Sequence, residues 1–219
     1  MAAPSPSSEH TTDSSVFRAA LRREKLAARM ELDGSAHAAL SARIEAHLAT
    51  LLTALPPQTL AFCAPVRGEF DARPLAGLLI RRGWNAAMPV AEVAAAPMRF
   101  RHWTLASAMH SDRHGIPVPI DGPDVVPDIV LLPLLAFDTQ GFRLGYGGGY
   151  FDRTLAALVP RPLAIGVGFE LARVADIRPQ PHDMPLDAVV TEAGMVRYPS
   201  SVGLPGRSAP CGPSDSDRG

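Results

Sequence analysis

The run Asp128-Ile-Val-Leu-Leu-Pro133 is continuously apolar between its first aspartate and its closing proline. A strand with one wet face alternates polar and apolar residues, whereas an uninterrupted short apolar run is typical of a strand covered on both faces. Strands of this kind occur in parallel sheets with crossover helices on either side. The run therefore predicts a central strand of an α/β sheet.

Further apolar runs and helical periodicities alternate along the chain on both sides of this strand. Two N-terminal helices are expected, one starting within 13–15 and running to about Leu32, and one from Ser35 to Pro56. The other expected elements are strands at 59–64, 85–90, 98–103, 163–167 and, last, 187–190, and helices at 73–82 and 147–158. This order predicts a three-layer, Rossmann-like α/β sandwich with a mostly parallel sheet, preceded by the two helices.

The composition is that of a globular domain, with 47% hydrophobic and 20% charged residues in a chain of 219. Pro/Ser-rich ends predict a disordered leader at 1–13 and a disordered tail at 198–219, which leaves a single domain at 14–197. The net charge of −1 argues against nucleic acid or an anionic membrane as a partner. Because the start lacks the order of a secretory signal and no apolar run could span a bilayer, we expect a cytoplasmic protein.

A glycine-rich stretch, Arg143-Leu-Gly-Tyr-Gly-Gly-Gly-Tyr-Phe-Asp152-Arg153, lies between the central strand and an expected helix. Glycines let backbone N–H groups approach a ligand, and a helix N-terminus adds unpaired donors and partial positive charge. Arg143 and Arg153 supply guanidinium groups that match phosphate oxygens, and Asp152 supplies an oxygen ligand suited to magnesium. A flexible turn would explain the glycines alone; together with the arginines and the carboxylate they favour a phosphate site.

Two common nucleotide motifs are excluded by the spacing of these residues. The stretch has no Gly-Lys-Ser/Thr ending, so it is not a Walker P-loop, and its glycines do not follow the Gly-x-Gly-x-x-Gly order of a dinucleotide fold. The residues alone therefore indicate a phosphate-binding α/β enzyme and leave open which phosphate compound it takes.

Five segments in chain order resemble the 5-formyltetrahydrofolate cyclo-ligase family, also called methenyltetrahydrofolate synthetases. The glycine stretch, with the preceding Pro133-Leu-Leu-Ala-Phe-Asp138, resembles the long signature of this family. The other four segments are Arg18-Ala-Ala-Leu21-Arg22, Arg67-Gly-Glu69-Phe-Asp71, Gly115-Ile-Pro-Val-Pro119 and Pro181-His-Asp183-Met-Pro-Leu-Asp187. The resemblance spans about residues 17–192.

The resemblance implies an ATP- and Mg²⁺-dependent conversion of 5-formyltetrahydrofolate, with or without a polyglutamate tail, to 5,10-methenyltetrahydrofolate, with release of ADP and phosphate. The formyl oxygen would be phosphorylated and N10 would attack the activated carbon. Such a transfer needs positioning and charge neutralisation more than a protein nucleophile, and none is expected here. We expect a monomer. Two alternatives stay open: a non-catalytic folate and nucleotide sensor, and a phosphate-binding isomerase or CoA-handling enzyme on a similar sheet.

The same resemblance assigns the site residues to three ligands. The residues expected to bind ATP are Arg18, Arg22, Arg143, Leu144, Gly145, Tyr146, Gly147, Gly148, Gly149, Tyr150, Phe151 and Arg153. Those expected to line the folate pocket are Ala64, Glu69, Gly148, Gly149, Tyr150 and Phe151, and the expected magnesium ligands are Asp152 and Asp183. Arg18 stands where the family has lysine and Phe151 where it usually has tyrosine. Asp187 is expected to be structural.

Overall fold

The computed structural model describes the backbone of residues 7–199 and the side chains of residues 14–199. Its centre is a seven-stranded sheet in the order β11-β10-β9-β6-β1-β2-β3. The five inner strands run parallel: β1 (Thr59–Ala61), β2 (Asn85–Val90), β6 (Ile129–Pro133), β9 (Leu163–Val167) and β10 (Ala188–Thr191). The antiparallel edge strands are β3 (Arg99–Trp103) and β11 (Gly194–Arg197). The predicted mostly parallel sheet is confirmed.

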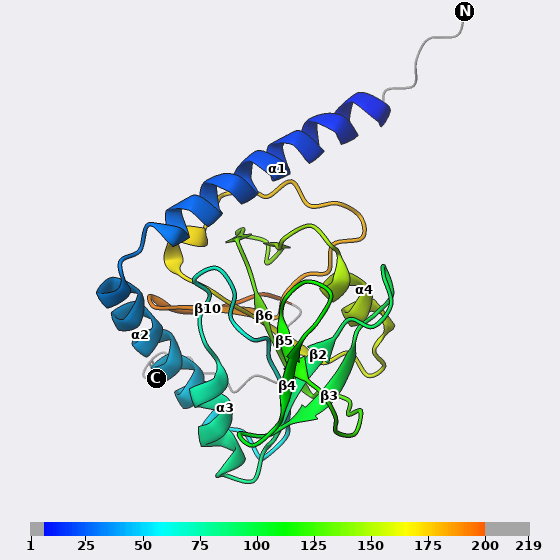
Figure 1. Ribbon diagram of the computed structural model, residues 1–219. Coiled ribbons are helices and arrows are strands. Elements are labelled where there is room, and N and C mark those ends of the chain that lie inside the picture. The colour runs from blue at the N-terminus through cyan, green and yellow to red at the C-terminus, as the bar shows by residue number, and fades with distance from the viewer. Residues whose placement is uncertain (1–6, 200–219) are drawn as a thin grey trace, which may run out of the picture.

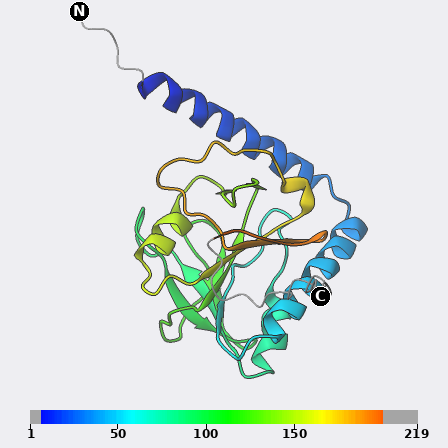
Figure 2. The ribbon, with the colours of Figure 1, turned by 180° about the vertical axis from the view of Figure 1, so that it is seen from behind.

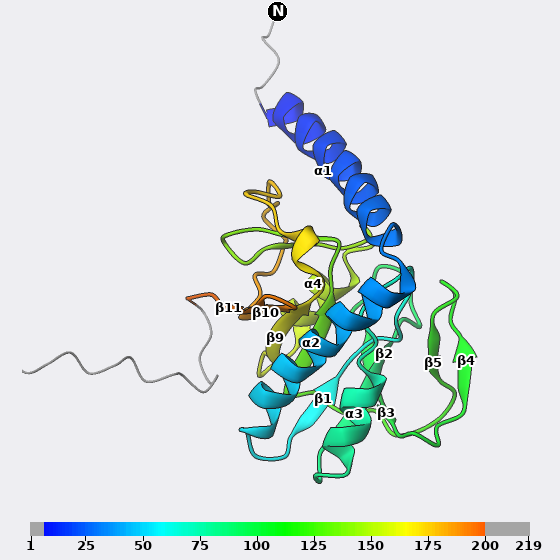
Figure 3. The same cartoon turned by 90° about the vertical axis from the view of Figure 1, so that its left-hand side faces the viewer.

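Helices cover both faces of this sheet. On one face α2 (Gly34–Thr53) and α3 (Arg73–Ile80) pack against the larger apolar core (Figure 3). On the other face Leu155 of α4 (Tyr150–Ala157) joins a second core, and Figure 2 shows α4 and α2 on opposite sides of the sheet. The first four residues of β6 are buried, as its uninterrupted apolar run predicted. The three-layer arrangement is therefore confirmed.

The strand order reverses between β1 and β6. From β1 the chain adds β2 and β3 in one direction, and from β6 it adds β9, β10 and β11 in the other. The carboxyl ends of β1 and β6 thus lie side by side, and the chain leaves them toward opposite halves of the sheet. In open α/β sheets the crevice at such a switch point is where ligands bind.

Helix α1 (Ser7–Met30) lies across this end of the sheet (Figure 1). Leu21 packs against Ala136 and Leu144, and Lys25 Nζ donates to the carbonyl of Leu171 at 3.0 Å, in the short 3₁₀ helix η1 (Glu170–Ala172). The helix begins at Ser7, so the second half of the expected leader is helical, and residues 1–6 lie outside the described range. Among residues 7–199, no helix combines the length and apolar character needed to cross a membrane.

Five short strands were not expected from the sequence. The hairpin of β4 (Met109–Ser111) and β5 (Pro117–Pro119) stands beside the β2–β3 end of the sheet (Figure 3). The hairpin of β7 (Ala136–Phe137) and β8 (Arg143–Leu144) leads into the glycine stretch. The fifth is β11, which follows the strand expected to be last. Strands of two to four residues are too short to show a clear period in the sequence.

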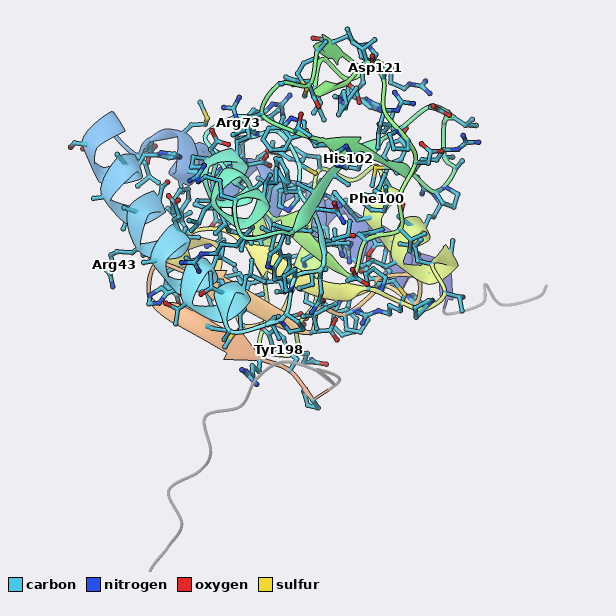
Figure 4. The ribbon with its side chains drawn as sticks, turned by 90° about the horizontal axis from the view of Figure 1, so that it is seen from below. Arg43, Arg73, Phe100, His102, Asp121 and Tyr198 are labelled. Atoms are coloured by element: carbon cyan, nitrogen blue, oxygen red, sulfur yellow. The ribbon has the colours of Figure 1, made fainter. Side chains whose placement is uncertain are left out.

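The packed domain extends beyond its expected end at residue 197. Tyr198 is only 5% exposed, and its hydroxyl donates to the carbonyl of Asp138 at 3.0 Å. Its backbone N–H donates to the carbonyl of Asp187, and Figure 4 labels the residue beside β10 and β11. Residues 200–219 of the expected tail lie outside the described range.

Truncating Tyr198 should therefore destabilise the whole domain. Replacing a buried aromatic ring with alanine removes packing and one of the two donors to the Asp138 carbonyl, so Tyr198→Ala should lower the free energy of unfolding by about 3 kcal/mol. Urea denaturation measures this change. The control is Met195→Ala on β11, where the side chain is 37% exposed, and its midpoint should stay close to wild type. An unchanged midpoint for Tyr198→Ala would place the end of the domain at residue 197.

Candidate functional site

The glycine stretch forms an open loop between β8 and α4. Gly149 is the N-cap of α4 with φ 63°, and Gly147 has φ 97°, both in the left-handed region that other residues rarely adopt. No side chain caps α4, so its first N–H groups are not taken by a side-chain acceptor. A helix N-terminus with open donors suits an anion.

Arg22 of α1 lies directly over this loop. Its Nε donates to the carbonyl of Gly145 at 2.8 Å, and its guanidinium carbon is 3.5 Å from where a Cβ on Gly147 would be. Burial lowers the pKa of Arg22, repulsion from Arg18 adds to this, and Asp183 opposes it. No described carboxylate forms an ion pair with Arg22, so this cation is placed to meet a ligand's negative charge.

Arg18 and Asp183 pair with each other. Arg18 Nη1 and Nη2 donate to Asp183 Oδ2 and Oδ1 at 2.5 and 3.1 Å, and both side chains are buried. The N–H of Gln180 also donates to Oδ2. Burial raises the pKa of Asp183, but the hydrogen bonds from Arg18 and Gln180 and the charge of Arg18 outweigh it, so the net pKa is lowered. Two residues expected to bind different ligands, ATP and magnesium, are thus engaged with one another.

Asp152 forms the second ion pair of the site. Its Oδ1 accepts from Arg143 Nη1 and from the N–H of Met184, each at 3.1 Å. The Met184 contact brings the first turn of α4 next to the segment that holds Asp183. No described residue donates to Oδ2 of Asp152, so this oxygen is open to a ligand.

Magnesium fits this arrangement through Asp152. Mg²⁺ is usually held by one or two carboxylates together with substrate phosphates and water, and Oδ2 of Asp152 can supply one such ligand. Asp183 does not fit in this conformation, because Arg18 occupies both of its oxygens. Within residues 14–199, no three His, Cys, Asp or Glu side chains gather where they could hold a metal ion without phosphate oxygens. Asp183 as a ligand stays a prediction that requires Arg18 to move.

A small cavity lies at the switch point, between the loop after β1 and the end of β6. The segment that follows β1 contributes Phe62, Cys63 and Glu69 to its lining, and the end of β6 contributes residues 131–133. Its volume is about 20 Å³, room for about one water molecule, so it must widen to admit a flat ring. Ala64, expected to line the folate pocket, is buried in the core and is not among the residues that line this cavity, so its role stays a prediction.

Glu69 is the buried carboxylate of this cavity. Its Oε1 accepts from the hydroxyl of Tyr146 at 2.9 Å, and its Oε2 accepts from the N–H of Val66 at 3.0 Å. Burial raises its pKa above the ordinary value, and the Val66 hydrogen bond, Arg29, Tyr146 and Arg67 offset only part of this. Burial and the charge of Glu69 raise the pKa of Tyr146 to about 12, so the Tyr146 hydroxyl keeps its proton and donates a hydrogen bond to Glu69.

The rest of the loop is held by its own aromatic and basic residues. Arg153 Nη2 donates to the carbonyl of Gly148 at 2.7 Å, and its guanidinium lies 5.2 Å from the centre of the Tyr150 ring. Phe151 is half-buried and faces Arg143 at 5.7 Å. The side chain of Leu144 is fully buried beneath the loop, so it offers a ligand only its backbone.

Two residues near the site were missed in the sequence. Arg29 is buried between α1 and the glycine loop, where it bonds to Tyr146. Its separations of seven and eleven residues from Arg22 and Arg18 place all three on one helical face, so helical spacing could have found it. His114, in the turn between β4 and β5, lies 3.2 Å from the Tyr150 hydroxyl. No local pattern marks that contact, because it joins two segments that meet only in the fold.

A basic helix face, a glycine loop and a buried carboxylate meet at the carboxyl ends of the parallel strands, and they define an α/β enzyme with its ligand site at the switch point. Comparison with known proteins agrees. The model of the 5-formyltetrahydrofolate cyclo-ligase family matches residues 14–192. The chain belongs to this family, and the prediction that it is a ligase enzyme is confirmed.

Individual relatives support this assignment. The 5-formyltetrahydrofolate cyclo-ligase of Escherichia coli K12 is 34% identical over 154 residues, which cover 65% of this chain and 85% of that protein. The enzyme of the same name from Mycolicibacterium smegmatis is 31% identical, and the match covers 61% of this chain and 73% of that protein. The NMR structure of Aquifex aeolicus 5,10-methenyltetrahydrofolate synthetase aligns with a TM-score of 0.74 at 26% identity, over 88% of this chain and 96% of that one.

The raised pKa of Glu69 gives the folded protein a specific pH dependence. The folded state binds this proton more tightly than the unfolded state, so the contribution to stability is fully present below the ordinary pKa of 4.5 and is lost as pH rises through the folded pKa. The unfolding free energy of wild type should therefore fall relative to that of Glu69→Gln, which cannot lose this proton, as pH rises above about 4.5. Urea denaturation at several pH values tests this. Glu31→Gln, at an exposed residue just after α1, is the control, and a flat difference for Glu69→Gln would contradict the prediction.

Proposed function

We propose that this enzyme converts 5-formyltetrahydrofolate to 5,10-methenyltetrahydrofolate at the expense of ATP. The observation that carries the proposal is the hydrogen bond from Tyr146 to Glu69, which joins an anion-suited glycine loop to a buried carboxylate pocket at the switch point. The relatives from E. coli and A. aeolicus, named for this substrate and this product, support it.

On the nucleotide side, this chain offers three kinds of group to a triphosphate. The loop and the start of α4 present backbone N–H groups, Arg22 presents a guanidinium with no carboxylate partner among the described side chains, and Arg153 lies at the edge of the loop. Asp152 would hold the magnesium ion through its open oxygen. When bound, Mg²⁺ neutralises phosphate charge and fixes the geometry of the transfer.

On the folate side, Glu69 is placed to accept hydrogen bonds from N–H groups of a flat heterocycle. Each carboxylate oxygen has a second acceptor site besides the one used by Tyr146 or Val66. Tyr150 and Phe151 follow the glycines and can pack on the same ligand. These contacts would bring the formyl group toward the loop where the phosphates bind.

The reaction balances without a protein nucleophile. The terminal phosphoryl group moves from ATP to the formyl oxygen and ADP is released. N10 then bonds to the formyl carbon, its proton is lost, and phosphate leaves with the former formyl oxygen. The residues around the site supply charge neutralisation and orientation, the contributions such transfers depend on. We further propose a monomer acting in the cytoplasm, with polyglutamylated folate also accepted.

The direct test is to mix the purified protein with ATP, magnesium and 5-formyltetrahydrofolate and to follow the absorbance of the methenyl product. Product should appear only when all three are present. Folded protein that forms no product would refute the proposed function, and ATP hydrolysis without folate would indicate a different enzyme.

Asp152→Asn separates the metal role from the structural one. Asparagine keeps the size and an acceptor oxygen for Arg143 and Met184, but it removes the charge that would hold Mg²⁺. Turnover, measured below the unfolding temperature of the variant, should fall by at least about a hundredfold with a higher magnesium requirement. The unfolding temperature should also fall, because the buried Arg143 loses its counter-charge. Asp121→Asn, at an exposed residue (Figure 4), is the matched control and should leave turnover unchanged. Near-normal turnover of Asp152→Asn at wild-type magnesium would remove Asp152 from the metal role.

A further inference from the structure

Arg29 bonds to three separate segments of the chain with one guanidinium group. Its Nε donates to the carbonyl of Arg67 at 3.0 Å, in the loop after β1, and its Nη1 donates to the carbonyl of Leu134 at 3.2 Å, just after β6. Its Nη2 donates to the hydroxyl of Tyr146 at 2.6 Å, in the glycine loop. The side chain is 5% exposed, so these bonds are made out of water, where they are costly to lose.

These bonds continue to Glu69. The Tyr146 hydroxyl accepts from Arg29 and donates to Glu69 Oε1, and Arg29 Nη2 lies 3.9 Å from the same oxygen. The result is a chain of hydrogen bonds from α1 through the glycine loop to the carboxylate in the cavity. Arg29 itself is not among the residues that line this cavity.

We propose that Arg29 is a positioning residue for the folate-side carboxylate: acting through Tyr146, it sets the position and charge of Glu69 and holds the glycine loop against the pocket. The inference rests on the proposed function, which supplies the folate as the ligand of Glu69. It assigns Arg29 a role in substrate affinity, whereas Arg22 on the same helix face serves the nucleotide.

The geometry requires arginine at this position. A guanidinium presents donors in a planar fork and can reach the Arg67 carbonyl, the Leu134 carbonyl and the Tyr146 hydroxyl at once. A lysine ammonium would place the same charge on one nitrogen and could not span the three partners. Arg29→Lys therefore separates the loss of the fork from the loss of the charge.

The first test compares Michaelis constants. Arg29→Met should raise KM for 5-formyltetrahydrofolate by roughly tenfold and raise KM for ATP less, because the lost hydrogen bonds orient the folate side. Arg29→Lys should restore little of the folate KM. Lys25→Met is the matched control, since Lys25 lies on the same helix and donates only to the Leu171 carbonyl. A wild-type folate KM in Arg29→Met, or equal rises in both constants, would overturn the inference.

The second test uses pH. Besides Arg29, the titratable and charged groups that face Glu69 are Arg67, Tyr146 and Cys63. Losing the positive charge of Arg29 should make the Glu69 carboxylate easier to protonate. As pH is lowered, the KM for folate should therefore begin to rise at a higher pH in Arg29→Met than in wild type. The pH at which KM begins to rise in Arg29→Lys should lie closer to that of wild type. Superimposable pH profiles would contradict a role in setting the charge of Glu69.

Tyr146→Phe keeps the test decisive if Arg29→Met does not fold. The Tyr146 side chain is 42% exposed, so losing its hydroxyl should leave the fold intact while breaking the link between Arg29 and Glu69. Its folate KM should rise as in Arg29→Met, and the double variant should be no worse than the more affected single variant. Fully additive effects in this cycle would show that Arg29 does not act through Tyr146.

Calorimetric binding of 5-formyltetrahydrofolate separates this inference from the proposed function. If wild type turns over but the variants keep wild-type folate affinity, only the role of Arg29 fails. If wild type binds the folate without turnover, the proposed reaction fails, and the dissociation constants of the same variants decide the role of Arg29. If wild type does not bind the folate, both are overturned.

Discussion

The arginines on the basic face of α1 need hydrogen-bond or ion-pair partners where the helix crosses the carboxyl ends of the strands, and the site is arranged around this constraint. Arg18 and Arg29 are both buried there, and an unpaired buried charge would cost several kcal/mol. Arg18 finds Asp183, whereas Arg29 finds two backbone carbonyls and Tyr146. Through these partners one helix fixes three loops: the loop after β1, the glycine loop and the segment that holds Asp183. The scaffold of the site and its electrostatics therefore come from the same contacts.

In this structure most charged side chains of the site neutralise one another. Arg18 and Arg143, both expected to meet ATP, already neutralise Asp183 and Asp152, whereas Arg22 and Arg153 form no ion pair with a carboxylate in the described part of the chain. A triphosphate would have to compete with these carboxylates, and a magnesium ion would have to compete with the arginines. Nucleotide and metal binding would thus exchange partners within an existing network, so the two ligands are more easily accommodated together than singly.

The sequence indicated the layers of the fold and the place of the site, because both depend on local patterns. The apolar run of β6 and the glycines before α4 each indicate a structure from about ten consecutive residues. The short strands β7, β8 and β11 could not be predicted in this way, because two to four residues show no period. Pairings between distant residues were equally hidden. Arg18 and Asp183 are 165 residues apart, and resemblance assigned each to a separate ligand, although the fold pairs them. Arg29 is the exception, because its helical spacing from Arg22 places both on one face of α1.

The contacts that anchor α1 also limit the order in which the domain can fold during its synthesis. This helix is synthesised before its partners, which follow later in the chain: residues 67, 134 and 146 for Arg29, 145 for Arg22, 171 for Lys25, and 178 and 183 for Arg18. During vectorial synthesis the contacts of Arg29 and Arg22 can therefore form first, that of Lys25 next, and those of Arg18 last, when almost the whole domain has emerged. Until then the basic face of α1 remains in water, and closure of the ligand site coincides with completion of the fold.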